Sequence, residues 1–233
     1  MNNQIFHRIW RIVRIPLGVI LVIYIGLVIY RIPAVEERQK TEKIVAKIHA
    51  QRITLADVLG QNLPPEPDVR LSAEGGSASG VKDSTIEGID ANDNGIRDDV
   101  ELAIFKLHPD PSSLRFGPEA SARIRAAELQ YAMALQGELT TIFNPETFVA
   151  VVQESSRGFF CIGDTFPKLN SSTSEQAWQE HDRLFDERIK EVEMLVFNTP
   201  QRIQKREKNF ENATSHGDIK GPNCNIDLVS LPN

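Results

Sequence analysis

The chain has 233 residues, of which 41% are hydrophobic and 25% charged, a composition typical of a folded protein and not of a disordered one. The first 31 residues hold four of the 26 basic residues and no acidic one, so the remaining chain sets 22 basic against 32 acidic residues. Such an acidic body lacks the basic footprint that nucleic-acid binding requires, whereas it suits cation binding or solubility.

An apolar run near the N-terminus predicts a transmembrane helix. Residues 15–30, IPLGVILVIYIGLVIY, carry no charge, and extending the run back across Arg14 gives about 19 residues, close to the roughly 20 that span hydrocarbon. Trp10 and Tyr30 fall near its two edges, where interfacial aromatics lie. The sequence around Ala34 fits a signal-peptidase site poorly, which favours an uncleaved signal anchor over a cleaved signal peptide.

The orientation of this anchor follows from the short tail before it. Three Arg and no acid make translocation of that tail unfavourable, although a simple count of positive charges on the two sides does not decide the matter. We expect residues 1–31 to form a cytoplasmic tail and a single-pass anchor in the membrane. The body then lies outside the cytoplasm, as in a bacterial inner-membrane protein with a periplasmic C-terminal domain.

The chain after the anchor predicts a stalk and a linker. Residues 32–60 read as a helical stalk that ends in a short helix, with Thr54 as its N-cap and Gly60 as its stop. Residues 61–83 contain three Pro and a Gly/Ser-rich patch, and they predict a linker. The extracytoplasmic domain is therefore expected over residues 84–233.

This domain is predicted to be helical throughout. Asn144 and Thr199 are N-cap candidates, and each is followed by a proline suited to the first helical position. No convincing run of alternating strand residues occurs. The predicted fold class is mainly α, an N-terminal transmembrane helix plus a small bundle with one EF-hand-like loop, and its helical patterns cover 118–139, 145–160, 172–197 and 199–213.

The two cysteines, Cys161 and Cys224, each lie just past a predicted helix. They are too few for a structural zinc site without nearby His partners, and they do not form a C-x-x-C redox pair. Two buried free thiols remain an alternative. An extracytoplasmic location favours a disulfide between them, so topology and disulfide support each other.

The stretch GIDANDNGIRDDVELAI, residues 88–104, has the strongest chemical signal in the chain. An EF-hand loop needs oxygen ligands at positions 1, 3 and 5, glycine at 6, a backbone carbonyl at 7, an oxygen or water at 9 and a bidentate Glu at 12. Gly95 stands at position 6 when Asp90 is position 1. The ligand positions of this loop, residues 90–101, are then Asp90, Asn92, Asn94, Ile96, Asp98 and Glu101.

On these residues the loop resembles the calcium loops of EF-hands and dockerins, and still more those of thrombospondin type 3 repeats. The last resemblance rests on Ile96 directly after the glycine, followed by Arg97 and Asp98. It covers about a dozen of the 233 residues, and the loop departs from that family because Asn92 and Asn94 are neutral and only one copy is present. The resemblance implies one bound Ca²⁺, and neither an EF-hand pair nor a calcium sensor.

A helix start is the alternative explanation of the same residues. Asp98 can N-cap a helix that begins at Asp99, with Glu101 at its third position in a capping box. This alternative leaves the alternation of Asp90 and Asn92 unexplained, and it is compatible with metal binding. Three carboxylates and two amides predict a modest calcium affinity, in the range of about 10⁻⁴–10⁻³ M.

We find no catalytic constellation in the sequence. The five histidines are scattered, and His181 lies on an apolar helix stripe where a core or boundary role is expected. The sequence therefore predicts a membrane-anchored extracytoplasmic calcium-binding protein with a structural or scaffolding role and an unknown protein partner. Two alternatives stay open: a calcium-independent helical interaction module, and an envelope hydrolase with an unrecognised site.

Overall fold

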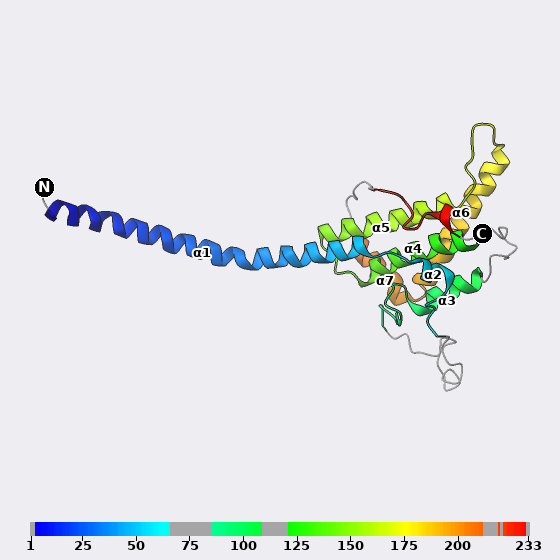
Figure 1. Cartoon of the computed structure of the whole chain (residues 1–233), viewed down its shortest axis with the longest axis horizontal. Coiled ribbons are helices and arrows are strands. Elements are labelled where there is room, and N and C mark those ends of the chain that lie inside the picture. Colours follow the sequence, from blue (N-terminus) through cyan, green and yellow to red (C-terminus); the bar gives the residue numbers. More distant parts are fainter. Residues whose placement is uncertain (1–2, 66–84, 109–120, 212–218, 220, 232–233) are drawn as a thin grey trace. The chain divides into compact units, whose positions relative to one another are not determined.

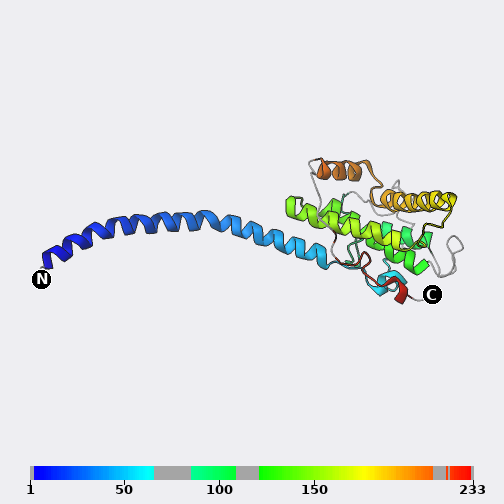
Figure 2. The same cartoon turned by 90° about the horizontal axis from the view of Figure 1, so that it is seen from above.

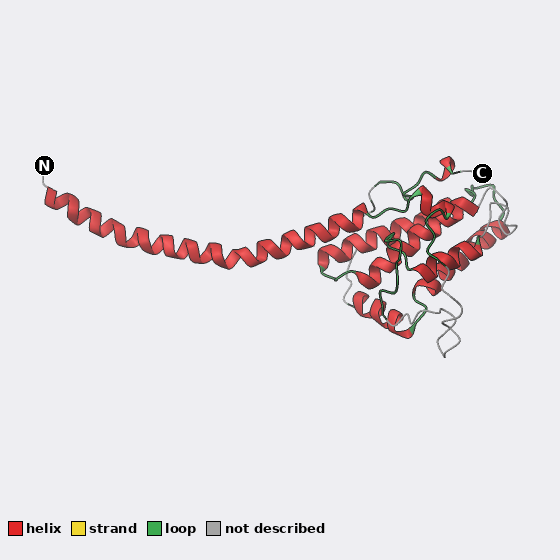
Figure 3. Cartoon of the chain, turned by 60° about the horizontal axis from the view of Figure 1, so that its bottom comes forward, coloured by secondary structure: helices red, strands yellow, loops and turns green. Residues whose placement is uncertain are grey.

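The computed structural model describes residues 3–65, 85–108, 121–211, 219 and 221–231 (Figure 1). Every regular element within these residues is a helix (Figure 3), which confirms the predicted mainly α class. The chain divides into two compact units, Met1–Ala46 and Lys47–Asn233, which we describe separately.

The first unit is one helix. The predicted span and the predicted stalk helix are continuous in α1, Asn3–Ala50. The part of α1 over Val19–Ala50 is long and apolar enough to cross a membrane, and none of its most apolar window is buried. Large apolar side chains between Val19 and Tyr30 are 47% to 79% exposed, which is unfavourable in water and favourable in hydrocarbon.

Capping residues define where the helices of the second unit begin. Asn144 accepts a hydrogen bond from the backbone of Thr147 at 3.0 Å, and Thr54, Ser174 and Thr199 cap their helices in the same way. The helices are α2 (Leu55–Leu59), α3 (Asp98–Leu107), α4 (Ser121–Thr140), α5 (Pro145–Asp164), α6 (Glu175–Val196) and α7 (Pro200–Phe210), followed by the 3₁₀ helix η2 (Leu228–Ser230).

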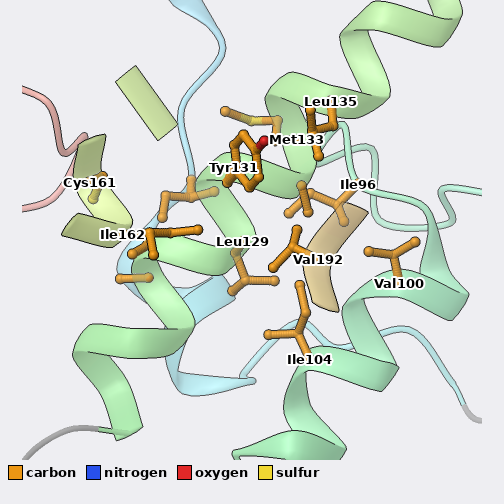
Figure 4. Packing of buried hydrophobic residues seen from close by; sticks show 14 of the residues in the cluster. Ile96, Val100, Ile104, Leu129, Tyr131, Met133, Leu135, Cys161, Ile162 and Val192 are labelled. Atoms are coloured by element: carbon orange, nitrogen blue, oxygen red, sulfur yellow. The ribbon is translucent and has the colours of Figure 1, made fainter. Parts of the chain in front are cut away.

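Helix α4 is the centre of the bundle. It packs along α5 and also contacts α2, α3, α6 and α7 (Figures 1 and 2). Nearly all of its side chains are buried, in agreement with a helix covered on every side. The core forms around it: Figure 4 shows Ile96, Val100 and Ile104 gathered near Leu129 of α4 and Val192 of α6.

The second unit begins earlier than the sequence suggested. Ile53 and Val58 are 3% and 0% exposed and belong to its hydrophobic core, although we expected a stalk over residues 32–60 and a folded domain only from residue 84. A short helix carries too few apolar residues to reveal on its own that it is buried. The rest of the predicted linker, residues 66–83, lies outside the described residues.

The cysteines lie where a disulfide requires them. The sulfur atoms of Cys161 and Cys224 are 2.12 Å apart, at bonding distance as predicted. Helix α5 runs to Asp164, so Cys161 lies inside its last turn and not beyond its end. Hydrogen bonds also hold the C-terminal segment: the Gln130 side chain donates to the Asn223 carbonyl and accepts from the Asn225 N–H.

Removing the disulfide is expected to destabilise the domain. The bridge closes 63 residues of chain, and replacing Cys161 and Cys224 by Ser should lower the free energy of unfolding by about 3–4 kcal/mol. Urea unfolding of the full chain in detergent micelles, followed by circular dichroism, measures this loss. Reductant should lower the stability of the wild type by the same amount and leave the double variant unchanged. A wild-type urea midpoint that does not change under reductant would contradict the prediction.

Candidate metal centre

The candidate loop, residues 90–101, connects irregular chain to α3. Residues 85–97 contain no helix, and α3 begins at Asp98. Only the outgoing side of the loop is therefore helical, which differs from the helix–loop–helix arrangement of an EF-hand. The capping-box interpretation of the helix start is wrong, because Arg97 occupies the N-cap position and makes no side-chain capping bond.

Asp90 organises the first half of the loop. Its carboxylate accepts hydrogen bonds from the backbone N–H of Asn94 at 3.1 Å and of Gly95 at 2.7 Å. These bonds bend the chain back over the Asp90 side chain. Burial raises the pKa of Asp90 above its ordinary value, although the two backbone bonds oppose this effect.

Glu101 is the other fixed carboxylate, and it is fully buried. The side-chain amides of Asn92 and Asn94 donate to its two oxygens at 3.0 and 3.1 Å. Burial raises the pKa of Glu101 to about 7, and the nearby carboxylates of Asp57 and Asp98 add to this rise. The loop therefore holds a buried acid whose described donors are neutral amides, an environment that favours a cation.

The remaining predicted ligands have separate roles. The Asp98 carboxylate accepts from the Ala91 N–H at 2.9 Å and so closes the loop across its base. Ile96 is 0% exposed and fills the core, while its N–H donates to the Asn94 side-chain oxygen at 2.9 Å. The structure thus brings Asp90, Asn92, Asn94 and Glu101 into one chain of hydrogen bonds, with Asp98 at its edge.

A sixth side chain, Asp57 of α2, reaches this group from 37 residues away in sequence. It is 1% exposed, and its Oδ1 atom lies 3.4 Å from the amide nitrogen of Asn94. Burial by itself would raise the pKa of Asp57, but hydrogen bonds from Thr54, Asn62 and Asn94 together lower it below its ordinary value. The sequence indicated Thr54 as a cap; its capping-box partner Asp57 was not recognised as part of the site.

Gly95 is favoured by its backbone conformation, and it also lies close to a neighbouring side chain. Its φ angle is +86°, in the left-handed region that favours glycine. A Cβ atom at this position would lie 2.0 Å from the Nε2 atom of Gln51, so the Gln51 side chain packs directly against the loop.

Arg97 ties the loop to the end of α6. Its guanidinium is buried, pairs with Asp99, and donates to the carbonyls of Leu195 and Val196 at 3.0 and 3.1 Å. These carbonyls belong to the last turn of α6, where a cation is favourable. Asn198 adds a bond of 3.1 Å to Asp99, so the loop and the α6–α7 junction support each other.

His181, the histidine singled out in the sequence, lies outside the candidate site. Its ring packs against Phe166 and Trp178, and its Nδ1 atom lies 3.2 Å from the carboxylate of the neighbouring Asp182. The side chain is 24% exposed, which fits the boundary role expected from its helical stripe.

The donor set is one that a hard cation accepts. Within the described part of the chain, no three His, Cys, Asp or Glu side chains gather closely enough to hold a metal ion by themselves. The candidate ligands are instead carboxylate and amide groups, whose oxygens suit Ca²⁺ better than zinc or copper. In this structure the amide nitrogens of Asn92 and Asn94 face Glu101, and their oxygens accept from the backbone N–H groups of Asn94 and Ile96. Both amides would have to turn to offer their oxygens to an ion. Asp90, Asn92, Asn94 and Glu101 would hold the ion, together with Asp98 and the backbone carbonyl of Ile96 as predicted. The ion would neutralise the buried charge of Glu101.

No protein-family model matches this chain, and neither the curated proteins nor the solved structures include a match to it.

Replacing Gly95 by Ala is expected to destabilise the domain. Alanine is strained in the left-handed conformation, and its Cβ atom would displace the Gln51 side chain. The free energy of unfolding should therefore fall by about 1–3 kcal/mol, which urea unfolding of the full chain measures. Gly137→Ala is the matched control, because Gly137 lies inside α4 with nothing within 4 Å of a new Cβ, and it should raise stability by about 0.5–1 kcal/mol. Equal effects of the two substitutions would contradict the prediction.

The raised pKa of Glu101 predicts how the stability of the metal-free protein depends on pH. Between the ordinary value of 4.5 and about 7, the folded state keeps the Glu101 proton and the unfolded state loses it. The contribution of Glu101 to stability therefore falls as the pH rises through this window and is constant above it. Urea unfolding in EDTA gives the free energies of unfolding of the wild type and of Glu101→Gln. The variant should become more stable relative to the wild type as the pH rises from 5 to 8. A difference that stays constant over this range would contradict the raised pKa.

Proposed function

We propose that this protein is a single-pass, membrane-anchored calcium-binding protein whose helical domain lies outside the cytoplasm and has a structural or scaffolding role. The observation that carries the proposal is the fully buried Glu101, held by the amides of Asn92 and Asn94 beside the backbone-fixed carboxylate of Asp90. A cation bound at this loop would compensate the negative charge of the buried acid, because burial without a counter-charge is costly.

The compartment is supported by two features. The cysteine pair at disulfide-bonding distance suits an oxidising environment, and the long apolar helix can anchor the chain in a membrane. In a bacterium this combination corresponds to an inner-membrane protein with a periplasmic domain. Extracellular calcium near millimolar concentration would fill a loop with an affinity of about 10⁻⁴–10⁻³ M.

The proposed role of the ion is to stabilise the fold. The loop contributes Ile96 to the core and Arg97 to the end of α6, so a cation that stabilises the loop would also stabilise its packing against the bundle. A ligand that binds only the folded state raises stability by RT ln(1 + [L]/Kd). At tenfold the Kd this gain is about 1.4 kcal/mol, enough to matter for a domain of ordinary stability.

Calorimetric titration of the full chain in detergent micelles with CaCl₂ tests the proposal. The wild type should bind one ion with a Kd of about 10⁻⁴–10⁻³ M. Glu101→Gln should bind at least about tenfold more weakly, because it keeps the size of the side chain and removes the charge. Asp186→Asn is the matched control, since it removes one acidic charge from an exposed position on α6 and should leave binding unchanged.

Circular dichroism in EDTA shows whether each variant is folded. Absence of binding by the folded wild type at millimolar calcium overturns the calcium proposal and favours a calcium-independent helical interaction module. Equal binding by the wild type and Glu101→Gln overturns the assignment of this loop as the site.

A further inference from the structure

The segment that follows the first unit, residues 47–62, lies on the candidate loop, and we call it the strap. It contains the last residues of α1, the whole of α2 and the turn after it. In Figure 1 its cyan ribbon runs beside α4 and α3. Ile53 and Val58 bury its apolar side in the core.

One end of the strap is held by polar contacts with α5. The Nδ1 atom of His49 lies 2.8 Å from the carboxylate of Glu154 on α5, and Arg52 approaches the same carboxylate at 3.7 Å. Arg157 pairs with Glu154 as well, at 3.1 Å. These groups are independent of the loop.

The other end of the strap meets the loop through the two asparagines of the candidate site. Asn92 donates to the carbonyl of Asn62 at 2.9 Å, and Asn94 approaches the carboxylate of Asp57 at 3.4 Å. The same two amides donate to Glu101 from the loop side. Each asparagine therefore links the strap to the buried acid of the loop.

Docking of the strap also brings two acidic side chains together. Asp57, 1% exposed, comes from the strap, and Glu101, 0% exposed, comes from α3. The amide of Asn94 lies between them, so ionisation of both acids in the docked state without metal places two negative charges near each other. Like charges in a poorly solvated place repel, and a divalent cation at the loop removes that cost.

We propose that calcium binding to the loop fastens the strap onto the domain, and that docking of the strap in turn raises the calcium affinity. This inference rests on the proposed calcium site and concerns its regulation. The two effects are reciprocal by thermodynamic linkage. Loss of calcium weakens the loop end of the strap, while the His49 and Glu154 contact keeps the other end in place.

Hydrogen–deuterium exchange of the full chain in detergent micelles, read on peptides within residues 47–62, tests the coupling. Calcium at millimolar concentration, compared with EDTA, should slow exchange in the strap by about tenfold. Peptides from residues 175–187 of α6 serve as the reference and should change by less than about twofold. The wild-type comparison requires no substituted protein to fold.

Asp57→Asn tests the electrostatic cause. This substitution removes the strap carboxylate and keeps one oxygen acceptor for Asn62, but it also replaces the oxygen that accepts from Thr54. The exchange of the variant in EDTA, compared with that of the wild type, shows whether the strap stays docked. In a docked variant the calcium-dependent slowing should fall below about twofold. Asp186→Asn, which removes the same charge from an exposed position on α6, should keep the full tenfold effect.

The outcomes separate this inference from the function on which it rests. Calcium binding by calorimetry with unchanged exchange in the strap overturns the coupling and leaves the calcium site intact. Slowing that is equal in the strap and in the α6 reference overturns the coupling too, because it reports global stabilisation. Absence of calcium binding overturns both.

Discussion

The burial of α4 on all sides is the constraint on which the rest of the domain depends. A helix covered on every face must find a partner for each polar side chain that it carries, since an unpaired buried polar group costs about 1–3 kcal/mol. Helices α5, α6 and α7 and the end of α3 supply such partners. Glu128 pairs with His108 and lies near Arg188 of α6, and Glu138 accepts from Ser155 of α5 and from Arg206 of α7. The polar contacts thus specify which element packs against which face, where apolar contacts alone would allow several arrangements.

The same constraint positions the candidate loop. Gln136 of α4 donates to the carbonyl of Glu87 at 2.7 Å, just before the loop begins. Arg202 of α7 donates to the carbonyls of Thr85 and Ile86, and Arg97 reaches back to the end of α6. The irregular chain before α3 has no ladder of its own, so these side-chain donors satisfy its carbonyl groups. The loop is therefore ordered by its surroundings first, and a cation would act on a shape that is already present.

The helices could be predicted from the sequence because their signals are local. Asn144 and Thr199 cap helices from the expected positions, and each is followed by proline at the first helical position. The site was predictable only in part. The spacing of Asp90, Asn92, Asn94 and Glu101 placed them in one loop, whereas Asp57 lies on a five-residue helix in a different part of the chain. Its role depends on the packing of α2 against α4, which no local pattern encodes. The early start of the domain escaped prediction for the same reason.

One extracytoplasmic location would suit the anchor, the cysteine pair and the candidate site together. A loop with two neutral amides among its ligands has an expected affinity of about 10⁻⁴–10⁻³ M, so cytosolic calcium would leave it empty and extracytoplasmic calcium would fill it. A disulfide follows the same division, because thiols stay reduced in most cytosols. The long apolar helix supplies the physical means of keeping the domain on one side of a membrane. A weak site of the kind proposed would be sufficient there to keep the ion bound. On the proposed function, the bound ion would compensate the buried charge of Glu101 and so stabilise the folded state in the compartment that supplies calcium.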